Sequence, residues 1–137
     1  MKYYHQDLTS EIINAFYQVY NELGYGFLER VYQNALFIEL QAKGLMVEIN
    51  KKIKVFYKGN EVSYYIADMV VNETVILELK ACDYIVEEFE FQLLNYLKAT
   101  ECEVGLLLNF GKKAECKRKL FHNNLKKHLN KPEANPD

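Results

Sequence analysis

The chain has 137 residues, a length typical of one domain with a substantial hydrophobic core. Half of the residues are hydrophobic and 14% are aromatic, a composition that excludes disorder over most of the chain. Seventeen basic and nineteen acidic residues leave a net charge of −2, which argues against a domain that holds nucleic acid by its overall charge. Any contact with nucleic acid must therefore be local, or be carried by a partner chain.

Cysteine usage and the first residues bear on the compartment. The three cysteines, Cys82, Cys102 and Cys116, form no CxxC pair, so they indicate neither a disulfide framework nor a zinc site. Free thiols fit a reducing cytosol. The polar residues 2–6 do not resemble a signal segment, and no apolar run reaches the roughly 18 residues of a membrane span. We therefore expect a cytoplasmic protein with no membrane partner.

Two amphipathic helices are expected first. Apolar residues recur at three- and four-residue steps over 8–23, with Asp7 or Thr9 as the N-cap, and again over 28–40. A Gly-Tyr-Gly turn separates these helices, and Gly44 ends the second.

The period then changes to that of β-strands, which are expected at 47–57, 62–71, 74–80 and 104–109. A helix at 87–100 precedes the last of these, which is apolar throughout and therefore buried on both faces. The order ααβββαβ predicts an α/β domain with a mixed sheet: antiparallel hairpins, then a helical crossover into a parallel strand.

The C-terminal part is less well defined by its pattern. Residues 116–121 fit either an edge strand or part of a terminal helix. We expect one domain at 1–125 and a disordered tail at 126–137, where both prolines stand.

Glu78 and Lys80 are the first candidates for chemistry. They stand two residues apart in an apolar strand, and so on the same face of it. Burying an unpaired carboxylate or ammonium there costs several kcal/mol, so the two side chains must pair, bind a metal, or lie at an exposed strand end. Asp68, ten residues before Glu78, falls opposite residues 77–78 across a tight turn. Converging carboxylates repel unless a cation bridges them, and oxygen ligands favour Mg²⁺ or Mn²⁺. A Glu78–Lys80 ion pair on a half-exposed strand is the alternative.

Two further pairs of residues share helix faces. Glu29 and Tyr32 are three apart at the start of the second helix, and Gln92 and Tyr96 are four apart on the third. Each pair alone has an ordinary interpretation. An acidic residue in a first helical turn stabilises the helix dipole, an exposed glutamine needs no role, and either tyrosine can belong to the core.

Together these segments resemble the GxxExxY family of the PD-(D/E)xK nuclease-like superfamily. Ala67 stands where the superfamily usually has proline, a change that leaves the Asp68 carboxylate in place. The resemblance covers about residues 8–121 and rests on five segments in the right order: Gly26-Phe27-Leu28-Glu29-Arg30-Val31-Tyr32, the strand of Asp68, Glu78-Leu79-Lys80-Ala81, Gln92-Leu93-Leu94-Asn95-Tyr96-Leu97 and Gly105-Leu106-Leu107-Leu108-Asn109-Phe110-Gly111.

The resemblance implies an αβββαβ core, a mixed central sheet flanked by helices, with the carboxylates on the second and third strands. Lys80 would orient or help to deprotonate the attacking water, and Gln92 and Tyr96 would support the site or the substrate. It implies four ligands for Mg²⁺ or Mn²⁺: Asp68, Glu78, the Leu79 carbonyl and Glu29.

Two functional hypotheses follow. The first is a metal-dependent nuclease that hydrolyses phosphodiester bonds, of DNA rather than RNA, in which Lys80 also stabilises charge on the phosphate. The second is a non-enzymatic module that keeps the nuclease fold and binds a protein or nucleic-acid partner, or forms a homo-oligomer. Eleven tyrosines would suit such an interface.

Overall fold

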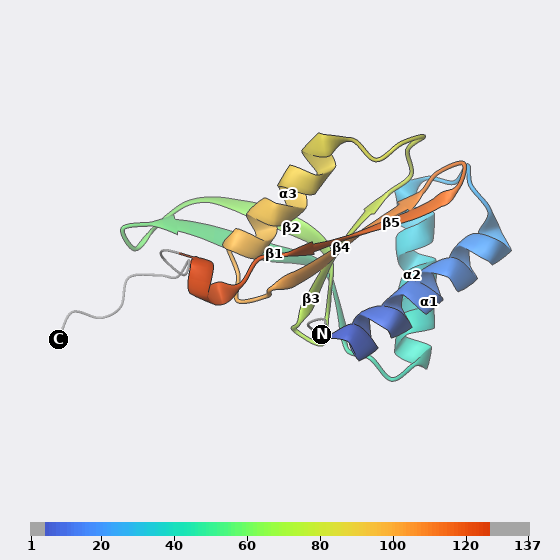
Figure 1. The fold of residues 1–137 in the computed structure, drawn as a ribbon, viewed down its shortest axis with the longest axis horizontal. Coiled ribbons are helices and arrows are strands. Elements are labelled where there is room, and N and C mark those ends of the chain that lie inside the picture. Colours follow the sequence, from blue (N-terminus) through green and yellow to red (C-terminus); the bar gives the residue numbers. More distant parts are fainter. Residues whose placement is uncertain (1–4, 127–137) are drawn as a thin grey trace.

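A computed structural model describes residues 5–126 of the chain. No helix in this range is long and apolar enough to cross a membrane. The elements are, in chain order, α1 (Gln6–Leu23), α2 (Glu29–Ala42), β1 (Val47–Tyr57), β2 (Asn60–Val71), β3 (Val75–Lys80), α3 (Glu87–Lys98), β4 (Val104–Phe110), β5 (Ala114–Leu120) and the 3₁₀ helix η1 (Asn123–Leu125) (Figure 1).

The strands form one mixed sheet in the order β1-β2-β3-β4-β5. Neighbouring strands are antiparallel except for β3 and β4, which run parallel because α3 carries the chain back across the sheet. The predicted α/β class and mixed sheet are confirmed. Residues 116–121, for which a helix was the other candidate, belong mostly to the edge strand β5, where Cys116 pairs with Leu108.

Helices cover both faces of the sheet (Figure 1). On one face, α1 and α2 bury Phe16 and Leu36 against odd-numbered residues of β3 and even-numbered residues of β4, among them Leu77. On the other face, α3 buries Leu93 against Ile76 and their neighbours. Even-numbered residues of β3 therefore point toward α3. That parity places Glu78 and Lys80 on the α3 face.

Two boundaries differ from the sequence-based expectations. Helix α1 starts at Gln6, so Asp7 lies inside its first turn and neither Asp7 nor Thr9 is the N-cap. Thr9 Oγ1 instead donates to the carbonyl oxygen of His5, a bond that a helical threonine makes inside the turn. At the other end, Lys126 Nζ donates to the carbonyl oxygens of Thr100 and Cys102, so the folded part includes the first residue of the expected tail. Residues 127–137 of that tail lie outside the described range.

The hairpin of β1 and β2 is long and ends in a two-residue turn. Tyr57 pairs with Asn60, and the intervening Lys58 and Gly59 both have positive φ angles, 51° and 77°. Such turns suit the twist of antiparallel strands. Strand β2 therefore begins two residues before the predicted 62, and the hairpin projects beyond the helices (Figure 1).

Halfway along this hairpin the side chains change faces. The register of β1 against β2 includes neither Asn50 nor Asp68, and Asn50 has a φ of 52°. On the two sides of this gap, Met69 packs in the core under α1 and α2, whereas Ala67 packs in the core under α3. Gln33 of α2 holds the gap, because its Nε2 donates to Asn50 Oδ1 at 3.1 Å and to the Asp68 carbonyl oxygen at 3.0 Å. We call this feature the face switch.

Candidate active site

The candidate site lies where β2 and β3 stop pairing as a regular ladder. The pairing ends at Met69 and Leu77. One residue further on, the Asp68 N–H donates to Glu78 Oε1 at 3.0 Å, and the Leu79 N–H donates to Asp68 Oδ2 at 2.7 Å. Each carboxylate thus accepts a hydrogen bond from the backbone of the opposite strand. The hairpin length predicted this placement of Asp68 across from Glu78.

Burial raises the pKa values of both carboxyl groups. Glu78 is 3% exposed, and burial together with the neighbouring Asp68 raises its pKa to about 8. Burial also raises the pKa of Asp68, although the Leu79 N–H and Lys80 act in the opposite direction. Within residues 5–126 neither carboxylate forms an ion pair. Because two adjacent anions are unfavourable in a buried site, Glu78 keeps its proton at neutral pH unless a cation joins the pair.

Lys80 approaches the carboxylates without forming an ion pair with them. Its Nζ donates to Gln92 Oε1 at 3.2 Å and lies 4.5 Å from the centre of the Phe89 ring. Its charge nevertheless lowers the pKa values of Asp68 and Glu78. The alternative interpretation of the strand, a Glu78–Lys80 ion pair, is therefore wrong. The ammonium is held by α3 next to the acidic pair.

Glu29 stands at the first position of α2 and is exposed. Partial burial raises the pKa of Glu29, and the charges of Lys80 and Asp68 respectively lower and raise it further. No three or more His, Cys, Asp or Glu side chains of the described chain are arranged to hold a metal ion. Glu29 thus interacts electrostatically with Asp68 and Lys80 but shares no ligand cluster with the two carboxylates.

Tyr32 fixes the loop that leads into Glu29. Its hydroxyl donates to the Gly24 carbonyl oxygen at 2.6 Å and accepts the Phe27 N–H at 3.2 Å. Its buried ring stacks on Phe110 with 4.2 Å between centroids. Tyr32 is therefore a core residue that sets the path of the loop, and it reaches the site only through Glu29.

Gln92 and Tyr96 both face the acidic pair from α3. Gln92 accepts from Lys80, as described above. Tyr96 is 4% exposed, and burial followed by the charges of Glu78 and Asp68 raises the pKa of its hydroxyl. The five predicted side chains other than Glu29 thus meet on one face of the sheet.

A family model described as the PD-(D/E)XK nuclease superfamily matches residues 6–119. The chain belongs to this superfamily. No curated protein and no solved structure matches the chain significantly. The match spans α1, α2, α3 and all strands but the last residue of β5, so it covers every residue of the candidate site described above.

The site chemistry of this superfamily member fits a hard divalent cation. The donors are carboxylate oxygens of Asp68 and Glu78, which form no ion pair within residues 5–126, and the backbone carbonyl of Leu79 at the same strand end. Mg²⁺ is commonly held by one or two carboxylates together with water and substrate phosphate. Two protein carboxylates are therefore sufficient, and a third from Glu29 is not required.

Sequence reasoning missed two residues that shape the superfamily site. Gln33 bonds the Asp68 carbonyl oxygen, and the signal that could have found it is its position one turn after Glu29 on the same helix face. Phe89, placed by its spacing in the apolar stripe of α3, carries the Lys80 ammonium on its ring face. Its dual role has no signature in the sequence.

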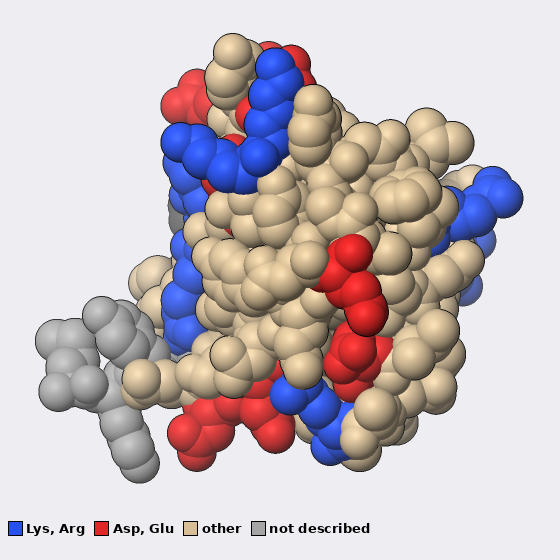
Figure 2. Space-filling model, turned by 90° about the vertical axis from the view of Figure 1, so that its right-hand side faces the viewer, with Lys and Arg blue, Asp and Glu red and all other residues tan. Residues whose placement is uncertain are grey.

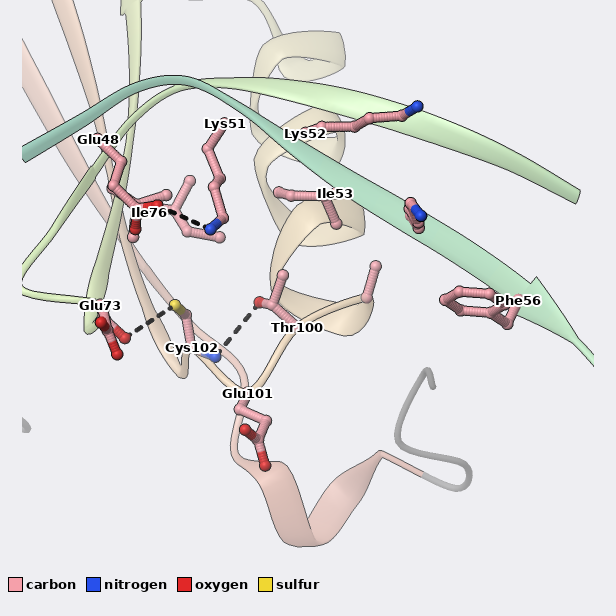
Figure 3. A pocket seen from close by; sticks show the side chains of 13 residues that line it. Glu48, Lys51, Lys52, Ile53, Phe56, Glu73, Ile76, Thr100, Glu101 and Cys102 are labelled. Atoms are coloured by element: carbon pink, nitrogen blue, oxygen red, sulfur yellow. Dashed lines mark hydrogen bonds and ion pairs between the residues drawn. The ribbon is translucent and has the colours of Figure 1, made fainter. Parts of the chain in front are cut away.

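A hollow of about 470 Å³ lies between β1 and the segment joining α3 to β4 (Figure 3). Its polar groups bond to one another: Lys51 pairs with Glu48 at 2.7 Å, and Cys102 Sγ donates to the Glu73 carbonyl oxygen at 3.6 Å. Burial raises the pKa of the Cys102 thiol, which keeps it protonated and weakly nucleophilic. None of the candidate-site residues described above lines this hollow.

Proposed function

We propose that the protein is a metal-dependent nuclease that hydrolyses phosphodiester bonds at the Asp68–Glu78 pair. One observation carries the proposal. The buried Glu78 and the half-buried Asp68 lie on neighbouring strands, each accepts a hydrogen bond from a backbone N–H of the opposite strand, and neither forms an ion pair in the described part of the chain. A purely structural pair would gain stability from replacement by apolar residues, whereas a cation site requires this charge.

The proposed ligands are Asp68, Glu78 and the Leu79 carbonyl, with Glu29 proposed to bind through a water molecule. When bound, Mg²⁺ or Mn²⁺ lowers the pKa of a water molecule and neutralises charge on the phosphate. The protein's own contribution is to hold the carboxylates in place before any ligand arrives. The face switch and the two backbone hydrogen bonds supply that rigidity.

Lys80 is the proposed electrostatic group for the substrate. Its ammonium donates to Gln92 at 3.2 Å and has two further hydrogens for a phosphate oxygen or the attacking water. Gln92 and the Phe89 ring restrict where that ammonium can point. A preorganised positive charge stabilises the transition state without reorganisation during the reaction.

Finer assignments are part of the same proposal. The Gly26, Glu29 and Tyr32 spacing supports membership of the GxxExxY family, since Tyr32 orders the loop before Glu29. The superfamily supports a nucleic-acid substrate, and we propose DNA ahead of RNA. The free cysteines support a cytoplasmic location.

The test is cleavage of labelled single- and double-stranded DNA and RNA with Mg²⁺, Mn²⁺ or chelator. We expect metal-dependent products from the parent, none from Glu78→Gln, and a steep fall for Lys80→Ala with Mn²⁺ binding retained. Lys43→Ala, at the opposite end of α2 from Glu29, is the matched control and should cleave normally. No cleavage of any substrate by the folded parent in either metal would overturn the proposal.

A second candidate is the non-enzymatic binding module, and one surface favours it. Figure 2 shows that most of the side formed by α1 and α2 is uncharged, with acidic side chains near its centre and lower edge and basic side chains mainly toward its margins. Along α2, Leu28, Val31 and Ile38 are 80%, 38% and 67% exposed. An exposed apolar stripe suits a protein partner or a second copy of the chain. Self-association that Ile38→Asp abolishes, without hydrolysis by the parent, would favour this candidate.

A further inference from the structure

A small hollow of about 260 Å³ opens between α3 and β2 on the face of the sheet that carries the nuclease site. Small-molecule sites commonly measure about 300–1,000 Å³, so this hollow suits a smaller, flat group. We call it the α3 pocket. Its lining residues are Tyr65, Glu88, Phe91, Gln92, Asn95 and Tyr96.

The α3 pocket is continuous with the proposed active site. Gln92 lines the pocket and also accepts the hydrogen bond of Lys80. Tyr96 lines it as well, and the charges of Glu78 and Asp68 act on the hydroxyl of this tyrosine. A group held in the pocket is therefore one side chain away from a phosphate placed at the carboxylates.

The lining combines aromatic ring faces with solvent-exposed polar groups. Phe91 is 55% exposed, although a phenylalanine at this position gains nothing by exposure in the free protein. Tyr65 packs against Tyr96 with 5.0 Å between ring centroids, which keeps its ring fixed at the pocket wall. Glu88 and Asn95 are exposed, and within residues 5–126 their side chains have no hydrogen-bond partner. Aromatic faces with polar groups at the edge are what bind a nucleobase.

The charge of the lining favours a base over a phosphate as the occupant of the α3 pocket. Among the residues that the structure describes, no lysine or arginine lines the pocket, and Glu88 adds a carboxylate that repels phosphate. An uncharged base is not repelled, and its amino groups can donate to Glu88 or Asn95. Stacking also supplies affinity without positive charge, which a chain of net charge −2 needs.

Resting on the proposed function, we propose that the α3 pocket holds one unpaired base of the strand that is cut. The substrate is then a single strand, or the unpaired end or gap of a duplex, because a paired base is not available for the pocket. The pocket acts by stacking, and it places the adjoining phosphate at Asp68 and Glu78.

The first test measures binding in chelator, where nothing is cut. A labelled single-stranded 12-mer, as DNA and as RNA, is compared with a strand of the same length whose sugars lack bases. Charge is equal, so a difference reports the bases alone. We expect the strand without bases to bind about 5- to 140-fold more weakly, the factor for one stacked base. Equal affinities, or no binding of either strand, would overturn the proposal.

The second test locates the effect. Phe91→Leu should remove most of that difference, because it keeps an apolar side chain but removes the ring, and Phe91→Trp should restore it. Tyr17→Leu, which removes an exposed ring on α1 over the opposite sheet face, is the matched control and should bind as the parent does. Unchanged base dependence in Phe91→Leu would contradict the pocket.

The two proposals fail separately. Cleavage of fully paired DNA with no effect of Phe91→Leu would keep the nuclease and overturn the pocket. Base-dependent binding that Phe91→Leu abolishes, without cleavage in Mg²⁺ or Mn²⁺, would keep the pocket and overturn the nuclease.

Discussion

Replacing Glu78 with glutamine should make the metal-free protein more stable, and increasingly so as the pH rises from 5 to 8. In the parent, burial and Asp68 raise the pKa of Glu78 from 4.5 to about 8. Over that interval the folded state holds a proton that the unfolded state has lost, so the stability of the parent falls as the pH rises. Glutamine has almost the same shape, keeps an oxygen for the Asp68 N–H and does not titrate.

The size of the effect follows from the pKa change. At about 1.4 kcal/mol per unit, it corresponds to roughly 5 kcal/mol above pH 8 and roughly 3 kcal/mol at pH 7. Glu78 is 3% exposed, so solvent screens little of this. Part of the stability that the parent loses as the pH rises comes from Asp68, whose pKa is also raised. We therefore expect the variant to exceed the parent by roughly 2–4 kcal/mol at pH 8 and by little at pH 5.

Urea unfolding in chelator at pH 5, 6, 7 and 8 measures this difference. Glu22→Gln, an exposed glutamate on α1, is the control and should follow the parent at every pH. At pH 8, Mn²⁺ at one hundred times its Kd should raise the free energy of unfolding of the parent by about 2.7 kcal/mol. It should leave the free energy of unfolding of Glu78→Gln unchanged. Parallel pH profiles for the parent and Glu78→Gln would refute the argument that the two carboxylates share a buried, uncompensated charge.

Two further predictions concern the supports of the site. Gln33→Leu removes the hydrogen bonds to Asn50 and the Asp68 carbonyl, so the free energy of unfolding should fall by about 1–3 kcal/mol and Mn²⁺ should bind more weakly. Gln41 is exposed near the end of α2, so the control Gln41→Leu should change neither quantity. An unaltered Mn²⁺ titration of Gln33→Leu would contradict the role of Gln33. Gly105→Ala should lower the free energy of unfolding in urea by about 1–3 kcal/mol, because the new Cβ would lie 2.7 Å from Cδ1 of the buried Leu93. An unfolding transition at the same urea concentration as that of the parent would show that α3 can move aside.

Much of the fold was predictable because its signals are local. The three-and-four spacing of apolar residues gave α1, α2 and α3, and the all-apolar β4 indicated burial on both faces. The short connection between β2 and β3 also placed Asp68 opposite Glu78, since a tight turn fixes the register of a hairpin. These features depend on neighbours in sequence.

Other features depend on contacts that a single sequence does not display. Residues 116–121 alternate too weakly to distinguish strand from helix, and pairing with β4 decides the outcome. The positive φ of Asn50 has no flanking glycine or turn motif, so the face switch was invisible. The partner of Lys80 was also unexpected. Gln92 comes from a different element, and only the packing of α3 on the sheet brings it to the ammonium.

The face switch divides the long hairpin into two independent parts. On one side of Asn50 and Asp68 the hairpin contributes Met69 to the core under α1 and α2. On the other side Ala67 packs under α3, and the strands then continue to a two-residue turn at Lys58 and Gly59. Adding or deleting matched residue pairs near that turn would lengthen or shorten the projection without altering how Met69 packs or where the Asp68 carboxylate lies. Evolution can therefore adjust the reach of this projection while the geometry of the Asp68–Glu78 pair stays constant.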